Sequence, residues 1–261
     1  MIGIFDSGIG GMSVVKEIMK LLPGQKISYY ADSAHCPYGK KTPEYIQGRA
    51  RTITDILLKD GADIIVIACN TATAAAVTTL REEYPNTHFI GMEPAVKPAA
   101  HNTLTGVVGI LATQGTLSGD KYQNTRDRFA GQSTIVEHAG EGFVELVESN
   151  NTEGPEAEAT VRHSLEPLIK AGADQIVLGC THYPFLKKTI AKVAEELAPE
   201  RKITIIDPAP AIARHLREIM TEEGISLEDN YHKDIIRSSD PAKQPEVEDI
   251  YKRILYSLKS F

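Results

Sequence analysis

The chain has 261 residues, of which 42% are hydrophobic and 24% are charged. It is therefore long enough for one large domain or two ordinary ones with a filled core. A net charge of −7 argues against a general nucleic-acid binder, which needs clustered lysines and arginines. The longest purely apolar run, residues 64–69, is too short to span a bilayer, and the first residues do not resemble a signal peptide. We therefore expect a cytoplasmic protein with neither a nucleic-acid nor a membrane partner.

Short runs rich in β-branched residues alternate with longer segments of helical periodicity. This alternation is typical of parallel sheets covered by helices and predicts an α/β fold. The expected strands are 2–5, 27–31, 64–68, 89–91, 107–111, 134–138, 175–179 and 204–206. The expected helices are 11–22, 43–60, 71–84, 115–129, 154–171, 183–198 and 209–223.

An internal repeat indicates how these elements are organised. Residues 51–71 align without gaps onto residues 162–182, and 9 of the 21 positions are identical. Each copy predicts a helix, a Gly-Ala-Asp turn and a buried strand that ends at a cysteine, Cys69 or Cys180. Such units are common in α/β folds, but a cysteine at the same point of both copies makes chance less plausible. The repeat predicts two pseudo-symmetric lobes, each a mainly parallel sheet flanked by helices, with the active site in the cleft between them.

The lobes need not be contiguous in sequence. We expect residues 1–93 and 209–261 to form the first lobe and residues 94–208 to form the second. In this arrangement the tail, residues 227–261, returns to the first lobe and supplies an edge strand and a closing helix.

The two repeated cysteines are the strongest candidates for chemistry. Ligands of open α/β sheets bind beyond the carboxyl ends of the strands, where Cys69 and Cys180 are expected. A cysteine at a helix N-terminus generally has a lowered pKa, which suits an acid or base near neutral pH. One such cysteine alone would be interpreted as a small apolar residue that ends a buried strand. Two at symmetric positions favour a pair of acid/base catalysts, with Cys36 as a bystander.

A glycine-rich turn, residues 6–11, follows the first strand and offers backbone N–H groups to an anion. It is not a dinucleotide fingerprint, because Ser13 occupies the position of the third glycine and Asp6 would repel a pyrophosphate. The resemblance of Asp32 to a ribose-binding acid is therefore interpreted as coincidence. A P-loop lysine is also missing.

Three other interpretations of the cysteines remain open. A zinc ion could bind Asp6, Cys69, Cys180 and His182, but no zinc-motif spacing supports it, so no metal is expected. A redox disulfide lacks the CxxC arrangement of exchange enzymes. A cysteine hydrolase could use Cys180 with His182, but we expect a base two residues away on the same turn to be poorly placed. A hydrolase would also leave Cys69 without a role.

Four motifs in this order resemble those of the glutamate racemases, within the aspartate/glutamate racemase superfamily. They are DSGIGG at residues 6–11, CPYG at 36–39, CNTA at 69–72 and GCTHYP at 179–184. The resemblance spans nearly the whole chain and implies two pseudo-symmetric α/β lobes. It also implies inversion of the α-carbon of glutamate without pyridoxal phosphate, metal or any other cofactor. The product D-glutamate would serve peptidoglycan synthesis.

The resemblance also implies roles for individual residues. Cys69 would deprotonate D-glutamate with the help of Asp6, and Cys180 would deprotonate L-glutamate with the help of His182. For the family's supporting glutamate, Glu148 is the first choice and Glu145 the second. The implied substrate-binding residues are Asp6, Ser7, Tyr38, Gly39, Asn70, Thr71, Thr113, Thr116, Thr181 and His182.

The chain departs from the usual family pattern at His35, at Lys40-Lys41 and in the segment 138–148, which lacks a Cys-Pro pair. A related racemase or decarboxylase for another acid is the nearest alternative. A catalytically silent two-lobed ligand-binding protein is the alternative from another class. Besides the small-molecule substrate, a homodimer partner stays open.

Overall fold

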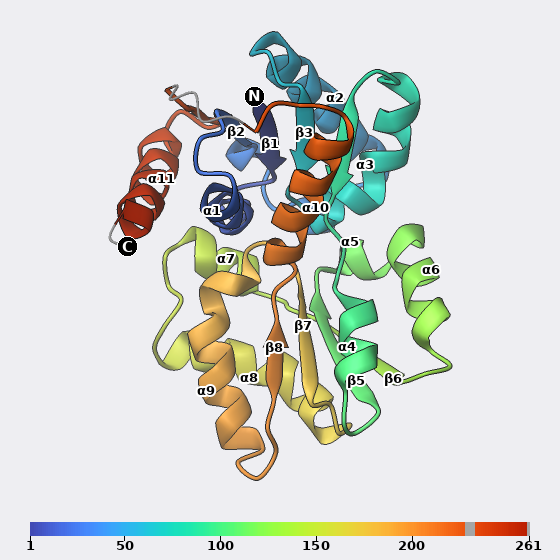
Figure 1. The fold of residues 1–261 in the computed structure, drawn as a ribbon. Coiled ribbons are helices and arrows are strands. Elements are labelled where there is room, and N and C mark those ends of the chain that lie inside the picture. The colour runs from blue at the N-terminus through green and yellow to red at the C-terminus, as the bar shows by residue number, and fades with distance from the viewer. Residues whose placement is uncertain (228–232, 260–261) are drawn as a thin grey trace. The chain divides into compact units, whose positions relative to one another are not determined.

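A computed structural model describes residues 1–227 and 233–259. The parts of the predicted tail at 228–232 and 260–261 lie outside the described residues. The chain divides into two compact units, which we call the first unit and the second unit (Figure 1). The first unit comprises Met1–Met92 and Ala209–Phe261, and the second comprises Glu93–Pro208.

The described residues of the first unit contain a five-stranded parallel sheet in the order β4-β3-β1-β2-β9. The strands are β1 (Ile2–Asp6), β2 (Ile27–Ala31), β3 (Ile64–Ile67), β4 (His88–Gly91) and β9 (Ile235–Ser238). In the register, Ile4 pairs with Tyr29 of β2 on one side and with Val66 of β3 on the other. Strands β1 and β3 are buried along their whole length, because helices cover both faces of a parallel sheet.

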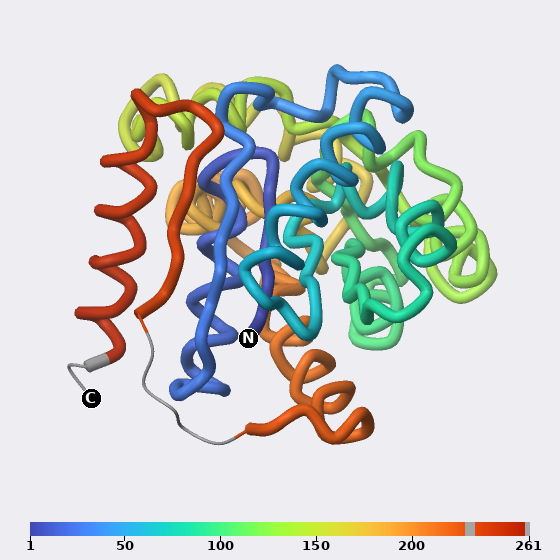
Figure 2. Tube along the Cα trace, turned by 90° about the horizontal axis from the view of Figure 1, so that it is seen from above, coloured from blue at the N-terminus to red at the C-terminus, as the bar shows by residue number. Residues whose placement is uncertain are grey.

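Helices from both ends of the chain cover this sheet. Helix α2 packs against α3, while α1 contacts both α10 and α11. Strand β9 pairs with β2 and α11 packs on β9, so the tail closes the edge of the first unit (Figure 2). The bounds are α1 (Met12–Leu21), α2 (Pro43–Lys59), α3 (Asn70–Glu83), α10 (Ala209–Glu222) and α11 (Gln244–Lys259), with 3-10 turns η1 (Ser33–His35) and η2 (Tyr38–Lys40).

The second unit repeats the topology of the first. Its four parallel strands lie in the order β6-β5-β7-β8, which matches the order β2-β1-β3-β4 when each unit is numbered from its own first strand. They are β5 (Val107–Ala112), β6 (Thr134–Ala139), β7 (Gln175–Gly179) and β8 (Thr204–Ile206). The helices are α4 (Val96–Asn102), α5 (Gln114–Leu117), α6 (Asp120–Phe129), α7 (Phe143–Glu148), α8 (Pro155–Lys170) and α9 (Lys187–Leu197), with the 3-10 turn η3 (Tyr183–Leu186). The repeat in the sequence is therefore a repeat of sheet order.

Helices α4 and α7 lie outside the helices predicted from the sequence, and two of the predicted helices have different bounds. The helix predicted at 115–129 is two helices, α5 and α6, because Gly119 between them has an extended backbone and glycine is a poor helix former. Helix α4, which was not predicted, contains Pro98. Pro98 lies in the first helical turn, where no backbone N–H is needed. The helix predicted at 183–198 begins as the 3-10 turn η3, and α9 starts only at Lys187.

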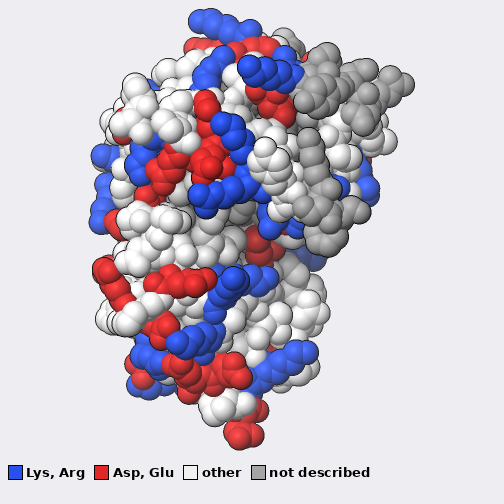
Figure 3. Space-filling model, turned by 90° about the vertical axis from the view of Figure 1, so that its left-hand side faces the viewer, with Lys and Arg blue, Asp and Glu red and all other residues white. Residues whose placement is uncertain are grey.

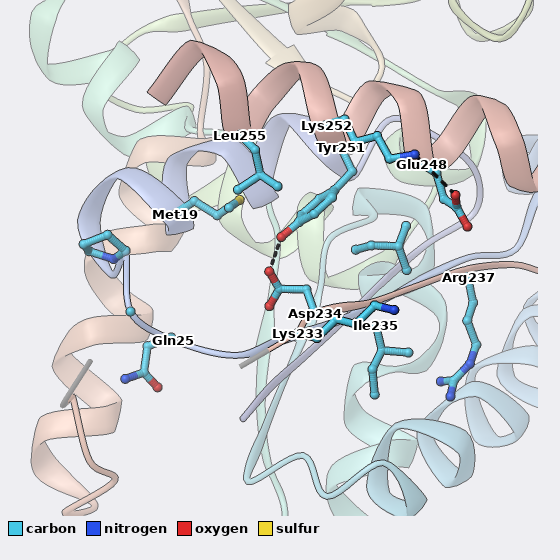
Figure 4. Close-up of a pocket in the computed structure, with 13 residues that line it drawn as sticks. Met19, Gln25, Lys233, Asp234, Ile235, Arg237, Glu248, Tyr251, Lys252 and Leu255 are labelled. Carbon is cyan, nitrogen blue, oxygen red and sulfur yellow. Dashed lines mark hydrogen bonds and ion pairs between the residues drawn. The ribbon is translucent and has the colours of Figure 1, made fainter. Parts of the chain in front are cut away.

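A cavity of about 920 Å³ lies in the first unit between α1, the start of β9 and α11 (Figure 4). Tyr251 of α11 donates a hydrogen bond to Asp234, which also accepts one from the Ile27 N–H at 2.7 Å. These contacts surround the amino ends of β2 and β9. Parallel strands all end at the opposite edge, so this cavity is remote from the strand end that precedes Cys69.

Lysine and arginine side chains are interspersed with aspartate and glutamate over the described residues of the face in Figure 3. Ion pairs between solvent-accessible side chains of opposite charge, such as Lys192–Glu158 and Arg253–Asp249, also occur in the chain. This mixed pattern differs from the single-sign basic stripe with which proteins follow a phosphate backbone. Among the described residues, no helix combines the length and the apolarity that a membrane crossing requires.

Candidate active site

Cys69 follows the end of β3 by two residues and is the N-cap of α3. Its sulfur accepts a hydrogen bond from the Ala72 backbone N–H at 3.4 Å and lies 3.9 Å from the Ser7 hydroxyl oxygen. The side chain is 5% exposed, so the α3 N-terminus acts on it with little screening by water. The positive end of a helix dipole and an N–H donor both favour negative charge on sulfur. Cys69 is thus placed to act as a thiolate.

Asp6 ends the neighbouring strand β1 and Ser7 follows it, at the same edge of the sheet. The Asp6 carboxylate is fully buried and accepts a hydrogen bond from the Gly8 N–H at 3.0 Å. Tyr29 supports the same turn by donating to the Gly8 carbonyl at 2.7 Å. A Cβ at Gly11 would lie 2.7 Å from the Asp6 Cβ, so only glycine lets the turn close around this carboxylate. The glycine-rich turn therefore holds an acid beside the Cys69 strand.

Asn70 and Thr71 follow Cys69 as the first residues of α3, and both are buried. Within residues 1–227 and 233–259, neither amide atom of the Asn70 side chain has a hydrogen-bond partner. Buried amides are nearly always satisfied, so an orphaned one needs an explanation. A polar ligand at the end of β3 would supply the missing donor and acceptor.

Tyr38 and Gly39 form part of the turn η2. The Tyr38 phenol is 1% exposed and donates a hydrogen bond to Asp32 at 2.5 Å. Tyr38 shares an apolar cluster with Cys69, so its ring lies on the Cys69 side of the unit. Since its hydroxyl proton is already used, Tyr38 can serve a substrate through its main chain but not by donation from its hydroxyl.

Cys180 has a different environment in the second unit. It follows β7 directly, and its sulfur lies 3.8 Å from Nδ1 of His182. The other ring nitrogen, Nε2, lies 2.8 Å from the carboxylate of Glu148 at the end of α7. The expectation that a histidine two residues from the cysteine would be poorly placed is wrong, because the turn after β7 brings its imidazole back to the sulfur. Glu148 is half-buried, whereas Glu145 on the same helix is exposed.

Three threonines complete the same edge of the second sheet. Thr113 follows β5 and caps α5, and its hydroxyl lies 3.0 Å from that of Thr116. Thr181 follows Cys180, and both Thr116 and Thr181 are 1% exposed. Strands β5 and β7 are neighbours, so these hydroxyls and Cys180 follow adjacent strand ends. They are suited to hold a carboxylate.

The structure corrects one expectation about the cysteines and adds two residues. Only Cys69 caps an α-helix, since η3 separates Cys180 from α9. The interpretation of Asp32 as a coincidental match missed its role as the acceptor for Tyr38, and Arg49 was not considered. Arg49 donates two hydrogen bonds to Asp32. The sequence did contain one indication that Asp32 lies near the site, namely its position directly after β2. The carboxyl ends of adjacent parallel strands lie at the same edge of a sheet, so this position puts Asp32 near Asp6.

Comparison with known proteins agrees with this arrangement. The profile of the Asp/Glu/Hydantoin racemase family matches residues 3–216. The glutamate racemase of Stutzerimonas stutzeri is 44% identical over 246 residues, which are 94% of this chain and 91% of that protein.

Solved structures extend the likeness to the fold. Escherichia coli glutamate racemase, in complex with L-glutamate and the activator UDP-MurNAc-ala, is 30% identical with a TM-score of 0.83, over 97% of this chain and 94% of that one. The enzyme from Francisella tularensis, in complex with D-glutamate, is 27% identical with a TM-score of 0.80, over 97% and 93% of the two chains. The profile match and the 44% identity over nearly the full length show that this chain belongs to the Asp/Glu racemase family and, within it, to the glutamate racemases.

Proposed function

We propose that this protein interconverts L- and D-glutamate by two-base proton transfer at the α-carbon, with Cys69 and Cys180 as the two bases. The observation that carries the assignment is the matched position of the cysteines. Each follows the strand next to the first strand of its unit, and the four strands of the second unit have the same order as the first four of the first unit. An enzyme that works on both faces of one carbon needs two such groups, one for each face.

In the D-to-L direction, the Cys69 thiolate takes the α-proton of D-glutamate, and the Cys180 thiol delivers its own proton to the opposite face. The reverse reaction starts with the Cys180 thiolate and ends with the Cys69 thiol. Each turnover moves one proton onto one sulfur and one proton off the other. For transfer, each sulfur must approach the α-carbon to about 3–3.5 Å, so the sulfurs are expected roughly 7 Å apart during turnover. A disulfide is excluded at that spacing.

The helpers differ between the two cysteines. His182, oriented by Glu148, can accept or return the Cys180 proton through Nδ1. A protonated imidazole would also favour thiolate at Cys180. Asp6 as a carboxylate would instead disfavour thiolate at Cys69, so we assign it proton handling. The N–H of Ala72 offsets this cost at the sulfur itself.

Substrate binding is proposed at the polar groups of both strand ends. The orphaned amide of Asn70 and the hydroxyls of Ser7 and Thr71 would hold one part of glutamate from the first unit. The main chain of Tyr38 and Gly39 would bind from the first unit as well. The hydroxyls of Thr113, Thr116 and Thr181 would hold another part from the second unit. Preorganised donors at the α-carboxylate stabilise the charge that develops as the proton leaves. No cofactor has a part in this scheme.

D-Glutamate made in this way would supply peptidoglycan synthesis, and we expect the protein to work in the cytoplasm. We also propose a homodimer, which sedimentation would detect as twice the chain mass of 28.5 kDa.

The Cys180–His182–Glu148 chain supports a second candidate, a cysteine hydrolase. A nucleophile, a base and a group that orients the base are present at hydrogen-bonding distances. A hydrolase has no use for Cys69, so Cys69→Ser would leave its activity in place. Loss of all turnover in that variant would exclude this candidate.

The direct test is an assay of the purified protein with L-glutamate and no added cofactor. We expect D-glutamate to accumulate until the enantiomers are equal, with no effect of EDTA or of carbonyl reagents that trap pyridoxal phosphate. Faster racemisation of aspartate would overturn the substrate assignment. Loss of activity with EDTA would restore the zinc interpretation.

A further inference from the structure

A buried carboxylate that the mechanism does not use lies at the Cys69 edge of the first unit. Asp32 follows β2, is fully buried, and donates its backbone N–H to the Asp6 carbonyl at 2.9 Å. Its side chain receives Nε and Nη2 of Arg49 at 2.9 and 2.8 Å, in bidentate geometry. The same carboxylate accepts the Tyr38 hydroxyl, and Nδ1 of His35 lies 2.9 Å away.

These contacts tie separate segments together. Arg49 comes from the middle of α2, Tyr38 from η2, and Asp32 from the end of the strand beside β1. The tail fixes the same loop from outside, because the Ser239 hydroxyl accepts the Ala34 N–H at 3.0 Å. Asp32 is thus the point at which the segment that leads to Tyr38 and Gly39 is anchored to the sheet.

Stability alone is a weak reason for this arrangement. A buried ion pair is often no more stabilising than apolar residues of the same volume, because both charges lose their hydration. What such a pair does provide is a fixed geometry, since a bidentate arginine–carboxylate contact constrains both partners. Here the geometry that is fixed is that of Tyr38, whose ring packs in the same cluster as Cys69.

The protonation states of Asp32 and Tyr38 preserve the hydrogen bond between them across the neutral pH range. Burial would raise the pKa of Asp32, but the hydrogen bonds from Arg49, Tyr38 and His35 outweigh it and hold that pKa below its usual value. Burial and the neighbouring Asp32 charge raise the pKa of Tyr38 well above its usual value. The phenol therefore stays a donor and the carboxylate an acceptor throughout the neutral range.

We propose that Asp32 is a positioning residue for substrate binding, which acts through Tyr38 to hold the main chain of Tyr38-Gly39 against the Cys69 side of the site. Arg49 in turn holds Asp32. The inference rests on the proposed function, since it assumes that Tyr38-Gly39 contacts glutamate. It assigns to the Tyr38 hydroxyl an anchoring role and leaves contact with the substrate to the main chain.

The test compares Tyr38→Phe and Arg49→Lys with Asp60→Asn. Asp60 is a matched control, because it also accepts two hydrogen bonds from an arginine, Arg237, and one from the Ser28 hydroxyl at 2.6 Å. Asp60 is the C-cap of α2, and its partner Ser28 lies near the amino end of β2, at the edge of the sheet opposite to Cys69. Tyr38→Phe removes one oxygen and keeps the ring, so it should fold even if Asp32→Asn does not.

In the two test variants we expect KM for both enantiomers to rise about tenfold or more, as a misplaced binding group would cause, with kcat changed much less. Asp60→Asn should keep the wild-type KM whatever its thermal midpoint. The dissociation constant for L-glutamate, measured by calorimetry in a Cys180→Ser background, should rise in parallel with KM for Tyr38→Phe. This second measurement does not depend on turnover.

A wild-type KM and dissociation constant in Tyr38→Phe would overturn the inference, and so would an equal rise in Asp60→Asn. Neither result would affect the proposed function, which the wild-type assay tests by itself. Absence of glutamate racemisation by the wild-type protein would remove both.

Discussion

The two cysteine environments occupy equivalent positions in equivalent sheets, yet they are built from different groups. Cys69 is the N-cap of a helix and has a backbone N–H and a serine hydroxyl near its sulfur. Cys180 has no helix directly behind it and faces an imidazole that is oriented by a carboxylate. The repeat of strand order therefore preserved the place of the thiol but not the means of handling its proton.

Asymmetry of this kind is what the substrate requires. Glutamate has three different groups around its α-carbon besides the proton, so the two faces cannot meet identical surroundings. The sheet fixes where each sulfur lies, and the loops after the strands supply the polar groups that differ. If the comparison is right, damage to either thiol should stop turnover, whereas damage to a helper should affect one face more than the other.

The largest expected effect is the loss of either thiol. Cys69→Ser and Cys180→Ser should each lower the rate of racemisation at least about 10³-fold, because a serine hydroxyl is too weak an acid to form the base. The rate is measured by circular dichroism with each enantiomer. Cys36→Ser is the control and should keep most activity, since Cys36 lies outside the repeated position. An equally damaging Cys36→Ser would show that position in the repeat does not identify the bases.

Isotope labelling should distinguish the proton transfers at the two thiols early in the reaction. In deuterium oxide, early D-glutamate made from L-glutamate should carry deuterium at the α-carbon, because the Cys69 thiol has equilibrated with solvent. Recovered L-glutamate should stay largely unlabelled, since Cys180 can return only the proton it took. Chiral chromatography followed by mass spectrometry, during the first few per cent of conversion, gives both values. Substantial label in the recovered L-glutamate would indicate a single base.

The next effect concerns the carboxylate behind His182. Glu148→Gln should lower kcat by roughly 10–100-fold, because an amide orients the imidazole less well and cannot stabilise its cation. Glu145→Gln tests the alternative assignment on the same helix and should change kcat little, since Glu145 is exposed. The opposite ranking of the two variants would transfer the supporting role to Glu145.

Much of this arrangement could be predicted from the sequence, because the signals were local or repeated. The periodicity predicted strands β1 to β8 to within a residue or two, and the family assignment from four motifs is confirmed. Strand β9 was expected only as an edge strand somewhere in residues 227–261. The contact between His182 and Glu148, in contrast, has no local or repeated signal in the sequence. It joins residues 34 positions apart and depends on how α7 packs beside the turn after β7.

The partners of Asp32 were likewise not predictable from the sequence. Its position after a strand was visible in the sequence, but its partners are not recognisable by spacing. Arg49 lies 17 residues away on a helix, and the Tyr38 phenol reaches back across a turn. A buried carboxylate is defined by the donors around it, and these are set by tertiary packing rather than by a motif.

The smallest and most specific change should be in the primary isotope effects of Asp6→Asn and His182→Asn. The enantiomers have equal free energies in water, so kcat/KM must remain equal for the two directions in every variant. Face-specific damage therefore has to be sought in primary isotope effects. Asp6→Asn should slow proton transfer to and from Cys69, which makes that step more rate-limiting. The isotope effect with α-deuterated D-glutamate should then rise, while that with α-deuterated L-glutamate should fall towards one. His182→Asn should give the reverse, because it slows transfer at Cys180. Changes of equal size for both substrates would mean that the helpers are shared between the faces, and the different surroundings of the two thiols would then have no part in distinguishing the enantiomers.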